Sequence, residues 1–207
     1  MKKGLLIALE GPDGCGKSTQ IKLLDKYFKD KGFDVIRTRE PGGTLISEKI
    51  RHIILDNNNS EMGSMCEALL YAASRAQLAD EVIRPALNEG KMVVCDRFVY
   101  SSMVYQGIGR DLGMEVVKTI NDAALRGIEA DLVFMISIPY EKGLERKKKQ
   151  QELDRLENVG NDFHKKVFDG YSKISKTYDK IIVIDGNESI ETIHEKIITH
   201  IEQKMGI

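Results

Sequence analysis

The chain has 207 residues, of which 42% are hydrophobic, and its 31 Lys and Arg side chains are nearly balanced by 32 Asp and Glu side chains. This length and composition predict one domain with a full core, and the balanced charge provides no global attraction for nucleic acid or a membrane surface. The apolar run behind the basic start is too short for a signal peptide, so we expect a cytoplasmic protein. The cysteines Cys15, Cys66 and Cys95 lack a C-x-x-C pair and a nearby histidine. We therefore expect neither a disulfide framework nor a zinc site.

The first predicted elements are a strand at 5–9 and a helix with Ile21, Leu24 and Phe28 on one face. The segment between them fits the phosphate-loop pattern G-x-x-x-x-G-K-[ST], in which glycines let backbone N–H groups turn toward phosphate oxygens. Its lysine adds a charge near the β- and γ-phosphates, and its serine hydroxyl can ligate Mg²⁺. A chance glycine turn is the alternative, but the strand before and the helix after favour a phosphate-binding loop. The expected phosphate-binding residues, which the resemblance given below assigns to ATP, are Gly11, Pro12, Asp13, Gly14, Cys15, Gly16, Lys17, Ser18 and Thr19.

Four more strands are predicted from the apolar runs that follow, with amphipathic helical stretches between them. These runs lie at 34–38, 92–95, 132–138 and 181–184. The alternation favours an α/β fold with a doubly wound parallel five-stranded sheet, helices on both faces and ligands at the carboxyl ends of the strands. Pro85 should kink or split the helical stretch 64–89 near its end. In the last helix, one stripe predicts core packing of Ile190, Ile193, Ile197 and Ile201.

Arginines follow several predicted strand ends, where the fold would gather them around the phosphate loop. Arginine suits phosphate because its planar fork donates two hydrogen bonds and stays charged. Arg39 and Arg97 lie directly at strand ends, so we expect them to bind phosphate rather than form surface ion pairs. Arg146 and Arg155 lie in a charge-dense tract, and for them the residues alone leave a solvated face equally open.

With these segments in place, the chain resembles the bacterial thymidylate kinases over nearly its full length. The resemblance rests on the phosphate loop and on the segments 39–44 (REPGGT), 70–75 (LYAASR), 96–107 (DRFVYSSMVYQG) and 154–157 (DRLE). It implies a P-loop NTPase fold of the nucleoside monophosphate kinase type, as one domain over 1–207 with a lid at about 141–160. It also implies transfer of the γ-phosphoryl group of MgATP to dTMP, giving dTDP and ADP, and a homodimer.

The resemblance further implies roles for individual positions. The expected catalytic residues are Lys17, Arg97, Arg146 and Arg155. The expected dTMP-binding residues are Asp13, Arg39, Tyr71, Arg75, Arg97, Ser102, Tyr105 and Gln106. Tyr71 would stack on thymine, Arg75 would bond to the base edge, and Tyr105 would pack under the sugar; by composition alone Tyr71 would be a core aromatic. The metal site would use Ser18 and Asp96, the latter through water.

Gly14 stands where the eukaryotic type of the family carries a loop arginine, so the resemblance implies that lid arginines supply that charge. Two alternatives stay open at this point. The chain could be a kinase for another small nucleotide, or a protein that switches a binding partner through nucleotide hydrolysis. A GTPase switch would show D-x-x-G after the third strand, where residues 96–99 read DRFV.

Overall fold

The protein was analysed as a computed structural model, which describes residues 4–140, 142–143 and 154–207. Five strands form one parallel sheet in the order β2-β3-β1-β4-β5, as the sequence predicts. The strands are β1 (Leu5–Glu10), β2 (Val35–Arg39), β3 (Met92–Asp96), β4 (Leu132–Ser137) and β5 (Ile181–Asp185). All five bounds agree with the expected runs to within one residue at each end.

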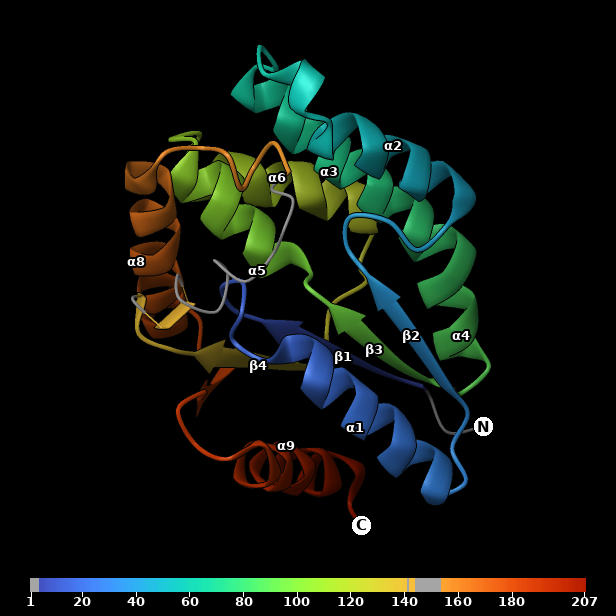
Figure 1. The fold of residues 1–207 in the computed structure, drawn as a ribbon. Helices are drawn as coiled ribbons and strands as arrows, with labels where there is room; N and C mark the ends of the chain where they lie inside the picture. Colours follow the sequence, from blue (N-terminus) through green and yellow to red (C-terminus); the bar gives the residue numbers. More distant parts are fainter. Residues whose placement is uncertain (1–3, 141, 144–153) are drawn as a thin grey trace.

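Helices cover both faces of this sheet, which confirms the doubly wound arrangement (Figure 1). The α-helices are α1 (Lys17–Asp30), α2 (Leu45–Leu55), α3 (Ser64–Leu78), α4 (Arg84–Asn88), α5 (Val99–Ser102), α6 (Met114–Leu125), α8 (Asn161–Thr177) and α9 (Ile190–Met205). A 3₁₀ turn, η1 (Asn57–Asn59), and two π-helices, η2 (Ala79–Ile83) and η3 (Met103–Gly109), complete the described elements. No helix in the described part of the chain is long and apolar enough to cross a membrane.

Alternation along β1 divides the core into two layers. Leu6 and Ala8 pack in the layer beneath α3, α6 and α8, whereas Ile7 and Leu9 pack in the layer beneath α1 and α9. Successive strand side chains point to opposite faces, so a strand that is apolar at every position must be covered on both sides. The central position of β1 therefore fixes the segment that follows it in the middle of the carboxyl edge.

Two helix predictions met different outcomes. The helical stretch is split before Pro85, as expected: the π-helix η2 separates α3 from α4, and Pro85 lies in the first turn of α4, where no backbone donor is needed. In α9, Ile193, Ile197 and Ile201 are buried, but Ile190 is 50% exposed, so its predicted core position was wrong. Helical side chains tilt toward the N-terminus, and the side chain of the first residue therefore projects past the helix end.

The strand register brings together the polar residues at the carboxyl ends of β1, β2 and β3. Asp96, which ends β3, pairs with Leu9 of β1 on one side and with Arg39 of β2 on the other. Glu10, Glu40 and Arg97 come next along their three strands and therefore meet at one edge.

Candidate active site

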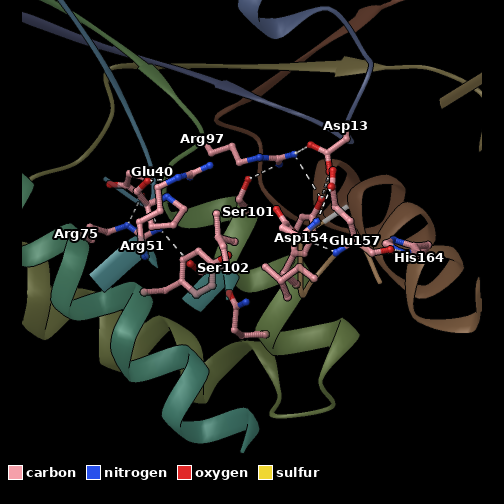
Figure 2. A pocket seen from close by; sticks show the side chains of 16 residues that line it. Asp13, Glu40, Arg51, Arg75, Arg97, Ser101, Ser102, Asp154, Glu157 and His164 are labelled. Atoms are coloured by element: carbon pink, nitrogen blue, oxygen red, sulfur yellow. Dashed lines mark hydrogen bonds and ion pairs between the residues drawn. The ribbon is translucent and has the colours of Figure 1, made fainter. Parts of the chain in front are cut away.

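Two adjoining cavities lie at the carboxyl ends of β1, β2 and β3. The inner cavity, of about 190 Å³, reaches from Tyr71 and Arg75 on α3 to Tyr105 on η3. The loop cavity, of about 380 Å³, lies over Lys17 and Ser18. The residues that line both cavities are Asp13, Glu40, Arg51, Arg97 and Glu157. Figure 2 shows Arg97 and Asp13 reaching toward each other at the rim of the inner cavity.

The phosphate-loop pattern folds as an open turn that leads into α1. A side chain at Gly11 would strike the carbonyl oxygen of Ile136, and both Gly11 (φ 132°) and Gly16 (φ 108°) have backbone angles that favour glycine. Lys17 begins α1, so the positive end of the helix dipole faces the loop cavity. Its Nζ is held 3.0 Å from the carbonyl oxygen of Gly11 and 3.1 Å from that of Pro12.

Six of the nine residues expected to bind ATP line the loop cavity, namely Asp13, Gly14, Gly16, Lys17, Ser18 and Thr19. Gly11, Pro12 and Cys15 do not line it, and Cys15 is buried behind the loop. Ser18 Oγ donates to Asp96 Oδ2 over 3.4 Å, and both residues line the loop cavity. This pair of oxygen donors suits Mg²⁺, which takes one or two protein ligands and completes its shell with water and phosphate oxygens. Within the described residues there is no cluster of three or more His, Cys, Asp or Glu that could hold a metal by itself.

Arg97 is the most constrained cation at the junction of the two cavities. It adopts a left-handed backbone (φ 67°), which costs an arginine roughly 1 kcal/mol or more and directs its side chain across the end of β1. One terminal nitrogen donates to Gly11 O at 3.0 Å, to Ser101 Oγ at 3.0 Å and to Tyr171 Oη at 2.7 Å. The other contacts the Asp13 carboxylate. These contacts fix the guanidinium beside the phosphate loop.

Two buried carboxylates support this junction from below. Glu10 accepts hydrogen bonds from the backbone N–H groups of Phe98 and Ser101 and from Ser101 Oγ, so it ties the end of β1 to the start of α5. Burial raises the pKa of Glu10 despite these donors and the charge of Arg97. Burial likewise raises the pKa of Glu40 to about 7, although its contact with Arg75 acts in the opposite direction.

Arg75 connects the inner cavity to four surrounding residues. Its Nε donates to Glu40 Oε2 at 2.6 Å, and its terminal nitrogens contact Asn121 Oδ1, Ser102 Oγ at 3.1 Å and Phe98 O at 3.2 Å. The side chain is 1% exposed yet lines the cavity. These four acceptors hold the charged guanidinium of Arg75 in a fixed position in the wall of the inner cavity.

Aromatic and amide groups complete the inner cavity. Tyr71 lines it and also packs at the border of the core, so the core and cavity interpretations both describe its placement. Tyr105 directs its hydroxyl to within 3.4 Å of both Asp13 and Arg97. Ser102 and Gln106 line the same cavity. Seven of the eight expected dTMP-binding residues thus border the inner cavity, and the eighth, Arg39, borders the loop cavity, where it pairs with Glu48 at 3.0 Å.

Arg155, which the resemblance implies is a catalytic lid residue, lies away from both cavities in this structure. We expected a lid charge directed at the phosphate loop, but its guanidinium is buried, with Nε donating to Ile54 O and a terminal nitrogen donating to Glu67, both at 2.7 Å. It lines neither cavity because these two acceptors hold it behind the cavity wall. Of the expected lid, 142–143 and 154–160 are described; Arg146 and residues 147–150 lie outside the described residues.

Sequence reasoning also missed several residues of the site. Arg51, on α2, lines both cavities and donates to Pro41 O at 3.0 Å; its place in an amphipathic helix offered no signal. Tyr171 was hidden in an apolar spacing of four with Phe163 and Val167 on α8, although its hydroxyl holds Arg97. Glu10 could have been found, because an ionisable residue that ends a wholly apolar central strand must be paired in the interior.

Comparisons with known proteins agree with this geometry. A family model described as Thymidylate kinase matches residues 9–197. A thymidylate kinase of Finegoldia magna is 47% identical over 200 residues, which cover 97% of this chain and 98% of the relative. Thymidylate kinases of Thermoanaerobacter sp. (49% identity; 95% and 96% covered) and Lactobacillus helveticus (47% identity; 98% of each covered) are similar over the same extent. The chain belongs to the thymidylate kinase family.

Proposed function

We propose that this chain transfers the γ-phosphoryl group of ATP to dTMP, giving dTDP and ADP, with the ATP phosphates over the phosphate loop and dTMP in the inner cavity. Membership of the thymidylate kinase family supports the reaction. One observation carries the assignment of the two cavities: they meet at Arg97 and Asp13, beside the phosphate loop. A donor and an acceptor phosphate bound on the two sides of that junction would be neighbours, as direct transfer requires.

The chain's own residues would act mainly by position and charge. Lys17 and the start of α1 bind the transferred phosphate group, and Arg97 binds the phosphate of dTMP while its protein contacts prevent it from turning away. Arg51, which lines both cavities, and Arg39, which lines the loop cavity, would add positive charge where the two phosphate groups meet. Ser18 and Asp96 would hold Mg²⁺ together with the phosphates, and bound Mg²⁺ neutralises charge on the phosphate oxygens.

The inner cavity would select the nucleoside. Tyr71 offers a flat face for the thymine ring, while Arg75 and Ser102 present polar groups to the base edge. Tyr105 packs under the sugar, and Asp13 accepts from the 3′-hydroxyl group. Arg155 stays a proposed lid residue. Its hydrogen bonds to Ile54 and Glu67 would anchor the end of the lid, which we call the lid base (154–160), to α2 and α3.

A homodimer is the second part of the proposal. Large apolar side chains are exposed on α2 and α3, which pack against each other: Leu45, Ile46 and Ile53 on the first helix and Met65 and Leu69 on the second. Such a group of exposed apolar side chains is typical of a surface that another subunit covers. Light scattering tests this proposal. The measured mass of the unmodified protein should be twice that of one chain, and the double substitution Leu45→Glu with Leu69→Glu should reduce the measured mass to that of one chain.

An acceptor panel tests the proposed reaction. With MgATP as donor, kcat/KM should be higher for dTMP than for dCMP, dGMP or AMP. The reason is that the polar groups of the inner cavity would match the hydrogen-bonding edge of thymine and not those of the other bases. If another nucleotide has the highest kcat/KM, the chain is better described as a kinase for that nucleotide. If the rate of ATP hydrolysis does not change with any added nucleotide, a nucleotide-switched binding protein is favoured.

A further inference from the structure

Glu67 is a buried carboxylate, outside the two cavities, on which three side chains converge. It lies on α3 with no exposed surface. From η3, Gln106 Nε2 donates to Oε1 at 3.0 Å. From the residue that follows η3, Arg110 donates to both carboxylate oxygens, at 3.2 and 2.9 Å. From the lid base, Arg155 donates to Oε2 at 2.7 Å.

This carboxylate is ionised and can only accept hydrogen bonds. Burial alone would raise the pKa of Glu67, but the hydrogen bonds and charge of Arg110, with the bonds from Gln106 and Arg155, hold it below its usual range. An ionised carboxylate has no proton to donate. Each group that faces Glu67 must therefore present a donor.

That restriction determines how the Gln106 side chain is oriented. A glutamine amide has an NH₂ end that donates and a carbonyl end that accepts, and the NH₂ end must face Glu67. The carbonyl oxygen Oε1 is then directed elsewhere, and it is a buried atom without a hydrogen-bond partner in a side chain that lines the inner cavity. A buried acceptor without a partner is unfavourable, and a bound donor would satisfy it.

We propose that Glu67 is a positioning residue for base specificity: it fixes the Gln106 amide so that Oε1 accepts the N3–H of thymine and repels the bare N3 of cytosine. This inference rests on the proposed placement of dTMP in the inner cavity. Glu67 touches no substrate, and it acts through the single amide that separates it from the base.

The substitution Glu67→Gln tests the role because it should reverse the amide. The terminal nitrogens of Arg110 and Arg155 both need an acceptor at the Oε2 position, so the new carbonyl oxygen would face them and the new NH₂ group would face Gln106. Arg110 Nε, which donates to Oε1 in the unmodified protein, would lose its acceptor in this arrangement. Gln106 would then turn its carbonyl toward residue 67 and its NH₂ toward the cavity. That arrangement opposes thymine N3–H and suits cytosine N3.

The readout is the ratio of two dissociation constants, for dTMP and for 5-methyl-dCMP, measured by calorimetry. These nucleotides share the 5-methyl group and differ only along the edge that carries N3 and the 4-substituent. The preference for dTMP should fall at least about tenfold in Glu67→Gln, since a tenfold change corresponds to about 1.4 kcal/mol. The ratio of the two kcat/KM values should fall with it.

Arg110→Met is the matched control. It removes a cation from the same carboxylate but leaves Glu67 ionised and bound to Gln106 and Arg155, so it should lower stability and keep the preference for dTMP. If Glu67→Gln does not fold because of an unpaired arginine, Glu67→Gln with Arg110→Met restores the charge balance and should show the same tenfold loss of preference.

A preference within about twofold of the unmodified protein, in either folded Glu67→Gln variant, would overturn the proposal. An equal loss of preference in Arg110→Met would also overturn it, because general loosening would then explain the effect. Failure of the unmodified protein to bind either nucleotide would overturn the proposed function itself, and this inference with it.

Discussion

Arg155→Lys separates an anchoring role from a catalytic one. In the structure, Arg155 Nε donates to Ile54 O and a terminal nitrogen donates to Glu67, each at 2.7 Å, and the side chain is 6% exposed. A lysine has a single charged group, which can keep the contact with Glu67 but leaves the buried carbonyl of Ile54 without a donor. Loss of one hydrogen bond from a charged donor costs about 2 kcal/mol, which would lower Tm by roughly 4–8 °C for a chain of this size.

The same substitution should leave the turnover rate within about threefold of the unmodified enzyme, a barrier change under ~0.7 kcal/mol. An arginine that stabilised the transferred phosphoryl group would instead be worth roughly 10³-fold. Thermal unfolding and steady-state kinetics at saturating ATP and dTMP, at fixed ionic strength, measure both quantities. Arg110→Lys is the control. Arg110 binds the same carboxylate, Glu67, and its substitution leaves the hydrogen bond between Arg155 and Ile54 O intact. A turnover rate that falls by about two orders of magnitude while Tm is unchanged would refute the anchoring role.

Three further predictions concern the two cavities and the carboxylates behind them. Lys17→Met should lower kcat by orders of magnitude while dTMP binding, measured by calorimetry, is nearly preserved, because Lys17 lines only the loop cavity; equal kcat would exclude the phosphate-loop role. Tyr105→Ala should weaken use of dTMP and narrow its advantage over the ribonucleotide, since a 2′-hydroxyl desolvated against the ring costs about 1–3 kcal/mol; an unchanged ratio of kcat/KM values would contradict the sugar contact. Burial raises the pKa of Glu40 to about 7 from 4.5, so between these values the folded state binds more protons and stability should decrease as pH rises; Glu40→Gln should flatten the dependence of Tm on pH, and parallel curves would contradict the raised pKa.

Local patterns were sufficient to predict the elements and the loop. The five strands and the loop at Gly11 to Lys17 depend on spacing within a few residues, and the strand bounds in the structure differ by at most one residue from the predicted ones. The carboxyl-edge rule then correctly grouped Arg97 with the phosphate loop. The strand order and the two cavities required the three-dimensional register, which no local pattern contains.

Residues whose partners are distant in sequence could not be placed in this way. Arg155 lies in a charge-dense tract that indicates a solvated face, and only its contact with Glu67, 88 residues away, shows that it is buried. Tyr171 lies 74 residues from Arg97, and its apolar spacing indicates nothing beyond core packing. Burial of a charged or polar side chain depends on the partner that satisfies its hydrogen bonds. Sequence spacing alone therefore does not predict which of these side chains are buried or which partners they contact.

The most direct measurement of the proposed phosphoryl transfer is the dependence of ATP turnover on dTMP. The unmodified enzyme is mixed with MgATP, with and without dTMP, and the nucleotides are separated and quantified over time. We predict that ADP and dTDP appear in equal amounts and that ADP production is negligible without dTMP. Equal ADP production in the absence of dTMP, or ADP production without dTDP, would contradict the proposed transfer.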